Sequence, residues 1–347
     1  MRNKAILLLL AGAILLAPGT SKAKKSDKTT TAPGEITSIE GATLWRQPDD
    51  IPSRNLFYGP GGKEHEPHGT FKFVKEDLEG SNPKFVVEDQ DGVKWKVKLG
   101  AEAKPETVAS RFVWAVGYFA NEDYFLANVH VEDMPAHLQR KHADKFIQPD
   151  GSMNDVRLKR EIAGEKKVGI WHWRHDPFKG TREYNGLRVL MAVINNWDLK
   201  DQNNAIYKEK RSAERDAPEV VYRISDLGAT FGSTNLRRTH EESKGNLDAY
   251  RKSKFIRDIE ADYVDFNVPS RPAVVVLVNP HEFFTRLHLE WIGRRIPLAD
   301  AKWMGRLLAQ LSPAQIRDAF RSASYSSEDT EGFSRIVESR IAQLNDL

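Results

Sequence analysis

Alternating apolar and polar positions predict three short strands near the start of the globular part of the chain. Residues 70–74 alternate, residues 84–88 favour β-structure, and residues 93–98 alternate again. An Asp-Gly pair at 91–92 is typical of a tight hairpin turn between the last two segments. The pattern therefore predicts an antiparallel meander over residues 69–99.

Helical periodicity follows directly after this meander. Pro105 suits a first helical turn, and the apolar stripe behind it ends at Gly117, which predicts a helix between the two. Two short β-favouring runs come next, and we expect a strand pair over residues 124–126 and 129–131.

The second half of the chain is expected to be mainly helical, with one hairpin inside it. Residues 181–195 carry enough apolar side chains for a buried helix. Strands at 205–207 and 220–224 flank a highly charged segment, which predicts a hairpin with a solvated tip. Further helices are expected in the tail, at 312–320, opened by a capping box, and at 328–344.

The amino terminus has the features of a secretory signal peptide. Arg2 and Lys4 precede an apolar run over residues 5–16, and a small-residue cleavage site ends at Ala23. The run is shorter than the ~20 apolar residues that a membrane span needs, so we expect cleavage and no stable membrane span. The chain has no cysteine, which together with export favours a bacterial periplasmic or extracellular location.

Charge and length restrict the classes of function and fold. The chain has 52 basic and 49 acidic residues, and the signal peptide (1–23) holds three basic residues and no acidic one. The basic and acidic residues of the mature chain are therefore equal in number, which gives no support for nucleic acid as a partner.

Beyond a polar, flexible linker (24–40), about 310 residues remain, which is more than a single hydrophobic core usually contains. We expect two lobes, at 41–133 and 134–347.

Two short motifs carry the candidate chemistry. One reads W-D-L-K-D-Q-N-N and places Lys200 two residues, and Asn203 five residues, after Asp198. The other reads I-S-D-L-G and contains Asp226. In order and spacing these segments resemble the catalytic loop and the metal-binding D-F-G loop of protein kinases.

The resemblance implies an α+β, two-lobed protein-kinase-like fold with an antiparallel β-rich amino-terminal lobe and a mainly helical carboxy-terminal lobe. It implies that Asp198 orients the acceptor and that Lys200 lies near the transferred phosphate. Asn203 and Asp226 would hold Mg²⁺ or Mn²⁺ on ATP. The expected activity is that of an ATP- and divalent-metal-dependent phosphotransferase, a kinase.

The turn E-G-S-N-P-K, which precedes the second strand, is a candidate phosphate-binding loop. It is similar to the phosphate loops of HipA-type and phosphatidylinositol-kinase-like enzymes. This likeness implies nucleotide contacts from Gly80, Ser81 and Lys84. A plain β-turn is the alternative.

Lys98 stands where the lysine of V-A-I-K stands in kinases, which implies a grip on the α- and β-phosphates. Glu106, in the first turn of the following helix, is the implied ion-pair partner. Lys84, Lys94 and Lys96 compete for the first role, and Glu102 competes for the second. We expect a partly exposed ion pair that contributes about 0–1 kcal/mol to stability.

Two departures from the protein-kinase pattern narrow the resemblance. Asn196 and Trp197 replace the His-Arg that precedes the catalytic Asp, and no A-P-E follows Asp226. The chain is therefore similar to the atypical branch that contains HipA-like, lipid-kinase-like and secretory-pathway kinases.

The sequence does not decide whether the acceptor is a protein, a lipid or a small molecule, and transfer of a nucleotidyl group is a further alternative. Because ATP is scarce outside the cytoplasm, an exported pseudokinase that binds nucleotide or protein is the alternative function.

Two histidine pairs raise a competing hypothesis. His65 with His68, and His172 with His175, have the H-x-x-H spacing that a zinc ion could use. A proline inside the first pair opposes helical presentation, and no H-E-x-x-H is present. The expected interpretation is histidines in surface loops.

Overall fold

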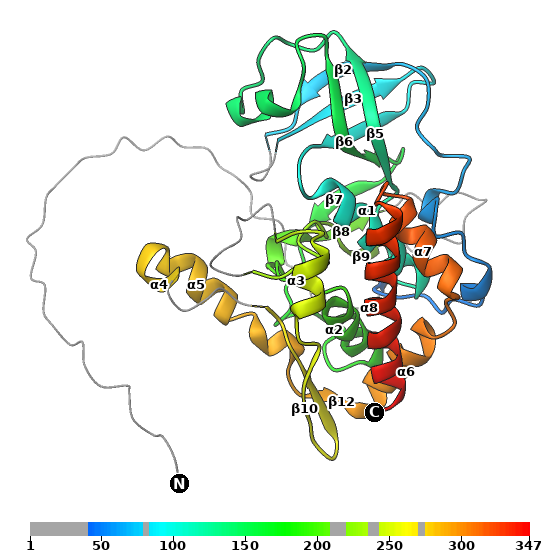
Figure 1. Cartoon of the computed structure of the whole chain (residues 1–347), viewed down its shortest axis with the longest axis vertical. Helices are drawn as coiled ribbons and strands as arrows, with labels where there is room; N and C mark the ends of the chain where they lie inside the picture. The colour runs from blue at the N-terminus through cyan, green and yellow to red at the C-terminus, as the bar shows by residue number, and fades with distance from the viewer. Residues whose placement is uncertain (1–40, 79–82, 209–219, 235–242, 270–274) are drawn as a thin grey trace, which may run out of the picture. The chain divides into compact units, whose positions relative to one another are not determined.

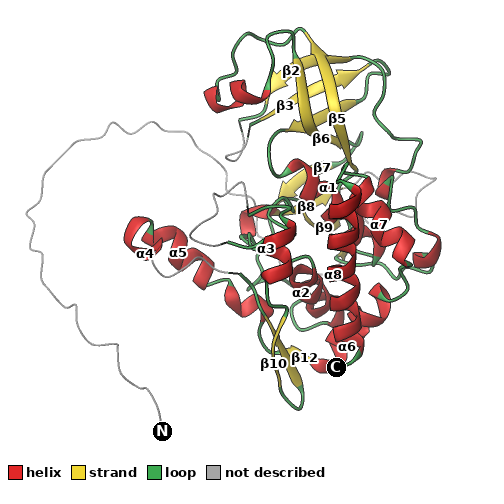
Figure 2. Ribbon diagram, viewed as in Figure 1, coloured by secondary structure: helices red, strands yellow, loops and turns green. Residues whose placement is uncertain are grey.

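Sheets and helices alternate along the chain in a mixed α+β arrangement (Figures 1 and 2). This computed structural model describes residues 41–78, 83–208, 220–234, 243–269 and 275–347. All of them belong to one compact unit. The expected signal peptide, the linker and the loop residues Gly80 and Ser81 lie outside the described residues.

Five strands close into a barrel in the order β2-β3-β4-β6-β5. Their bounds are β2 (Phe71–Glu76), β3 (Lys84–Asp89), β4 (Lys94–Lys98), β5 (Asp123–Glu132) and β6 (Ser152–Arg160). The meander expected from the sequence forms β2, β3 and β4, and the turn between the last two has a positive φ of 76° at Gly92. Alternate residues such as Trp95 and Val97 fill the interior of the barrel as a separate apolar core.

Two expectations about the barrel are wrong. Residues 124–126 and 129–131 belong to one ten-residue strand, β5, because β6 pairs along most of its length. The expected lobe boundary after residue 133 also falls inside the barrel, since β6 returns to close it between β4 and β5. A sequence pattern shows that a strand exists, but the partner that covers it lies elsewhere in the chain.

Helix α1 (Ala103–Ala115) packs against β5 and β6 on one side and against α7 on the other. It begins two residues before Pro105, which lies within its first turn. The expected stripe is confirmed, because Val108, Phe112 and Val113 are buried. These side chains belong to the larger apolar core, which they share with the helices of the second half.

A four-stranded sheet in the order β1-β9-β8-β7 follows the barrel. Its strands are β1 (Ala42–Thr43), β7 (Lys166–Gly169), β8 (Asn204–Lys208) and β9 (Val220–Ile224). The strand pairing of the expected hairpin is confirmed, because β8 and β9 pair antiparallel from Asn204 opposite Ile224, and its expected solvated tip at 209–219 lies outside the described residues. This pairing brings the beginning of β8 close to the end of β9. The motif residues just before β8 and just after β9 therefore lie at the same end of the hairpin.

The remaining elements are mostly helical. The buried helix expected at 181–195 is α2 (Arg182–Val193), and the Thr181 hydroxyl caps it by accepting the Tyr184 amide. The other α-helices are α3 (Leu247–Lys252), α4 (Val275–Val278), α5 (Pro280–Leu287), α6 (Leu298–Leu308), α7 (Pro313–Arg321) and α8 (Ser327–Asn345). The capping box of α7 is confirmed through Ser312 and Gln315.

Short strands and 3₁₀ turns connect these helices. A small sheet consists of β10 (Ile256–Ile259), β11 (Tyr263–Phe266) and β12 (Ile296–Pro297). The 3₁₀ turns are η1 (Ile51–Ser53), η2 (Gly59–Gly61), η3 (Lys141–Phe146), η4 (Asp201–Asn203) and η5 (Glu290–Gly293). Within the described ranges, no helix has the length and apolar character that crossing a bilayer requires.

Asp176, between β7 and α2, is a buried carboxylate that should make stability depend on pH. Its side chain is buried, one oxygen accepts the Phe178 amide at 2.7 Å, and burial raises the pKa of Asp176 to about 6. The folded chain therefore holds this proton more tightly than the unfolded chain does. This contribution to stability is fully present below the unfolded pKa, ~4, and is lost as the pH rises through about 6.

We predict that Asp176→Asn stabilises the protein at pH 8 by about 1–3 kcal/mol and leaves stability at pH 4 nearly unchanged. Urea denaturation across pH 4–8 measures both quantities. The exposed Asp248 supplies a matched control, because Asp248→Asn should change stability by less than about 0.5 kcal/mol. Equal pH profiles for the wild type and Asp176→Asn would contradict the prediction.

Candidate functional site

The buried ammonium group of Lys98 is the centre of the candidate site. It lies 2.8 Å from Glu102 Oε2, 2.8 Å from Glu106 Oε2 and 3.0 Å from Asp226 Oδ1, and its side chain is only 4% exposed. Burial lowers the pKa of Lys98, but Asp226, Glu102 and Glu106 raise it well above its usual value. The ion pair expected between Lys98 and Glu106 is present, and Glu102 joins it instead of replacing it.

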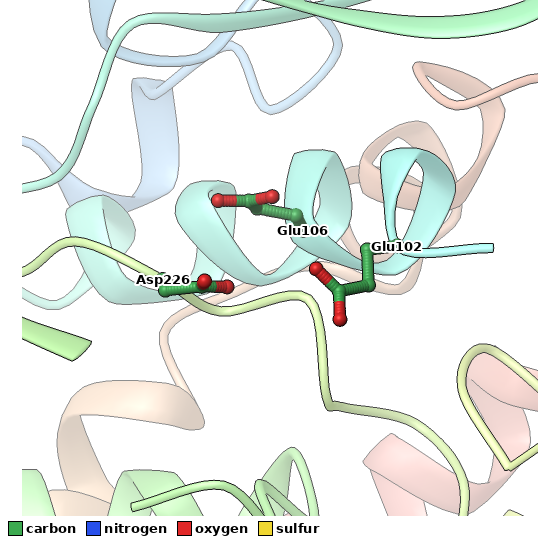
Figure 3. A group of neighbouring side chains, drawn as sticks. All are labelled: Glu102, Glu106 and Asp226. Carbon is green, nitrogen blue, oxygen red and sulfur yellow. The ribbon is translucent and has the colours of Figure 1, made fainter. Parts of the chain in front are cut away.

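Figure 3 shows how the three carboxylates reach this position. Glu102 and Glu106 are four residues apart at the start of α1 and so lie on one helix face. Asp226 approaches from the loop after β9. The approach is close: a Cβ atom added at Gly228 would lie 2.6 Å from Glu102 Cβ, which explains the glycine of the D-L-G motif.

The same three carboxylates are the one group with metal-ligand geometry within the described ranges. They offer oxygen atoms within 4.8 Å of one another. The Lys98 ammonium, however, already contacts an oxygen of each carboxylate. A divalent ion at their centre would have to displace Lys98. The three carboxylates are therefore better described as the ion-pair partners of Lys98 than as a metal site.

Further buried charges extend this cluster in two directions. Arg157 on β6 donates to Glu106 at 3.0 Å and lies 3.4 Å from the Asp123 carboxylate. On the other side, Lys244 contacts Glu102. Lys98 and Lys244 lower the pKa of Glu102 despite its burial. Sequence reasoning missed Arg157 and Lys244, because only the strand register and the fold bring them to α1.

The β8–β9 hairpin places Asn203 and Asp226 side by side. The Asn203 carbonyl accepts the Ser225 amide at 2.8 Å and the Asp226 amide at 3.1 Å. The Asn203 side chain in turn donates to the Asp198 carbonyl at 2.5 Å. The two motifs found in the sequence are therefore joined by hydrogen bonds at one point of the structure.

Asp198 itself is held by a residue from the distant helix α5. The guanidinium of Arg286 contacts the Asp198 carboxylate and donates to the Trp197 carbonyl at 3.0 Å. The Arg286 side chain is only 2% exposed, and Lys200 Nζ lies 3.8 Å from Asp198 Oδ1. Sequence reasoning gave the tail no role, and nothing in its pattern singles out Arg286.

A cleft of about 390 Å³ opens beside these groups. Five of the residues expected at the site line it: Lys84, Lys98, Glu106, Asn203 and Asp226. Asp198 and Lys200 lie outside the lining and connect to it through Asn203. A larger cavity of about 490 Å³ at the start of α1 contains none of the expected residues, so the smaller cleft is the candidate site.

The histidine pairs do not form a metal group among the residues that the structure describes. His65 contacts Glu122 at 3.0 Å, whereas His68 contacts Asp91 at 3.1 Å. His172 contacts Asp201 at 2.9 Å. These three histidines thus contact three different carboxylates, so neither pair converges on a shared group.

Comparison with known proteins gives structural likenesses but no match in sequence. No family model matches the chain, and no curated protein is similar to it in sequence. The structure is similar to the crystal structure of a Helicobacter pylori proinflammatory kinase, CtkA, with a TM-score of 0.40 and 10% sequence identity. That match covers 80% of this chain and 97% of the other chain.

The burial of Lys98 corrects the expected energy of its ion pair. A partly exposed pair would contribute little, but removing Lys98 leaves three carboxylates without their shared cation. We predict that Lys98→Met lowers the free energy of unfolding by about 3–5 kcal/mol. Urea denaturation at pH 7 measures the loss.

Lys94→Met is the matched control, because Lys94 is an exposed lysine on the same strand. It should change stability by less than about 0.5 kcal/mol. Equal denaturation midpoints for the two variants would show that the Lys98 cluster does not stabilise the fold.

Proposed function

We propose that this chain is an ATP- and divalent-metal-dependent phosphotransferase, an atypical kinase. The observation that carries the proposal is the cleft, which gathers Lys84, Lys98, Glu106, Asn203 and Asp226 from five separate segments of the chain. Phosphoryl transfer requires cations for the phosphates, oxygen ligands for a metal and a carboxylate near the acceptor. The residues in and beside the cleft have the chemistry of all three.

Lys98 and Lys84 would bind the phosphates. Lys98 is held in place by three carboxylates, so its ammonium group is oriented before a nucleotide arrives. Lys84 lies opposite Lys98 in the pairing of β3 with β4, so both lysines are at the same end of the barrel. Burial lowers the pKa of Lys84, and the nearby charge of Lys98 lowers it further. A bound phosphate would offset the repulsion between them.

Asn203 and Asp226 would hold the metal ion. An amide oxygen and a carboxylate suit Mg²⁺ or Mn²⁺, which prefer oxygen ligands. When bound, such an ion would neutralise charge on the phosphates and orient them for transfer. Asp226 now accepts a hydrogen bond from Lys98 at 3.0 Å, so the same carboxylate would link the lysine and the ion.

Asp198 would act on the acceptor. An acceptor hydroxyl would attack the terminal phosphorus and release its proton to the Asp198 carboxylate. The bond between that phosphorus and the bridging oxygen would break, and ADP would leave with the bridging oxygen. Arg286 would fix the orientation of Asp198, and Lys200 would offset the charge on the transferred group.

The fold that goes with this function is a two-lobed kinase-like arrangement. We assign the β2–β6 barrel and α1 to an amino-terminal lobe, and the β7–β9 sheet with the later helices to a carboxy-terminal lobe. The chain would pass between them after Arg160, at the end of β6. The HipA-like, lipid-kinase-like and secretory-pathway kinases are the proposed relatives, on the motif resemblance.

Export and an unknown acceptor complete the proposal. The amino-terminal sequence supports a cleaved signal peptide and a periplasmic or extracellular location. The acceptor would be a hydroxyl group on a protein, a lipid or a small molecule.

A pseudokinase is the alternative, and one contact favours it. Arg286 occupies the Asp198 carboxylate that would receive the acceptor proton. In a binding module this contact would be permanent, and nucleotide would bind without turnover.

Substitution of the two aspartates separates these functions. Asp198→Ala should keep binding of ATP with Mg²⁺ or Mn²⁺ and lose transfer by about 10²–10⁴-fold. Asp226→Ala should lose both, because it removes a metal ligand. Thermal shift measures binding, and autophosphorylation or ATP turnover of the mature protein measures transfer.

Asp248→Ala is the control, since Asp248 is an exposed acid on α3. It should match the wild type in both assays. Nucleotide binding without turnover in the wild type, unchanged by Asp198→Ala, would favour the pseudokinase. Absence of both nucleotide and metal binding would exclude the kinase and the nucleotide-binding pseudokinase.

A further inference from the structure

The lining of the cleft is unusually rich in cations. Of the described residues that line it, six are basic and three are acidic. The basic residues are Lys84, Lys96, Lys98, Arg157, Lys159 and Lys167, and the acidic residues are Asp77, Glu106 and Asp226. The strand register explains why several basic side chains lie side by side, because Lys98 on β4 lies between Lys84 on β3 and Arg157 on β6.

Aliphatic and aromatic side chains are few among the described residues of the same lining. The five uncharged members are Val97, Gln202, Asn203, Tyr207 and Ser225, of which only Val97 is aliphatic. Small-molecule sites are usually lined mainly by hydrophobic and aromatic side chains, which hold the organic part of the ligand. The described lining offers a nucleobase one aliphatic side chain, Val97, and one aromatic side chain, Tyr207.

Tyr207 is the one aromatic side chain in the described lining, and its ring is already engaged. Arg223 lies 4.4 Å and Lys159 lies 5.3 Å from the ring centroid. Lys159 also donates to the Tyr207 hydroxyl at 3.0 Å. Burial raises the pKa of Tyr207, but Lys159, Ser225 and Arg223 bring it below its usual value. The tyrosine is therefore part of the cationic surface and not an open stacking platform.

We propose that this cleft recognises its phosphoryl donor through the phosphate chain and not through the base. This inference rests on the proposed function and specifies its donor as any compound with a linear triphosphate. Stacking on an aromatic side chain strengthens binding by roughly 5- to 150-fold per base, and this cleft forgoes that contribution. ATP, GTP and inorganic tripolyphosphate then bind with similar affinity.

The chemistry balances for the inorganic donor as it does for ATP. The acceptor oxygen forms a bond to a terminal phosphorus of tripolyphosphate, and the bond from that phosphorus to the bridging oxygen breaks. Pyrophosphate leaves with the bridging oxygen, and the acceptor proton passes to Asp198. No reactant beyond the donor and the acceptor is consumed.

Calorimetric titration of the mature protein with Mg²⁺ and four probes tests the inference. The probes are ATP, GTP, inorganic tripolyphosphate and adenosine. ATP and GTP should have Kd values within about threefold of each other, because they present the same charges to the lysines, and tripolyphosphate, which has one more ionisable oxygen, should bind at least as tightly. Adenosine should show no saturable binding at millimolar concentration.

Two neighbouring lysines on β7 supply a matched pair of variants. Both are exposed, but Lys167 lines the cleft and Lys166 does not. Lys167→Ala should weaken all three triphosphates by the same factor, and Lys166→Ala should leave all three unchanged. Equal effects of the two variants would mean that the phosphates do not bind in this cleft, which overturns the inference.

The outcomes separate the inference from the function on which it rests. ATP binding more than about 30-fold tighter than GTP and tripolyphosphate would overturn base-independent recognition and leave the phosphotransferase proposal standing. Failure of every triphosphate to bind would overturn both. Turnover with tripolyphosphate that is lost in Asp198→Ala would support both.

Discussion

The need to keep the Lys98 ammonium paired inside the protein links the elements of the site. A buried charge without a partner costs several kcal/mol, and here the partners come from three places: β4 supplies the lysine, the start of α1 supplies Glu102 and Glu106, and the loop after β9 supplies Asp226. None of these elements can move alone without breaking at least one ion pair of Lys98. The ion pairs that hold α1 against the barrel therefore also hold in place the wall of the cleft that α1 forms.

Two further basic residues, from segments far apart in the sequence, form ion pairs with the carboxylates around Lys98. Arg157 connects Glu106 to Asp123 inside the barrel, and Lys244 connects Glu102 to the segment before α3. Burying so many charges is costly unless each is paired and hydrogen-bonded. Such an arrangement is poor at gaining stability, but it fixes the geometry of the few groups that face the cleft.

Local elements could be predicted from the sequence because their patterns are local. The meander, α1, α2, the β8–β9 hairpin and the capping box at Ser312 all follow from periodicity and turn residues, and the motif residues Asn203 and Asp226 do meet. Long-range pairing could not be predicted. The return of β6 to the barrel, the three-carboxylate environment of Lys98 and the contact from Arg286 depend on register and packing between distant segments.

The two-residue strand β1 has a consequence for how the chain folds. Ala42 and Thr43 pair in parallel with Val220 and Val221, and the Gln315 side chain on α7 donates to the backbone of the η1 turn that follows β1. The first described segment of the chain therefore completes its contacts only when β9 and α7, far along the chain, are in place. Contacts so distant in sequence slow folding, so this segment joins the folded structure late.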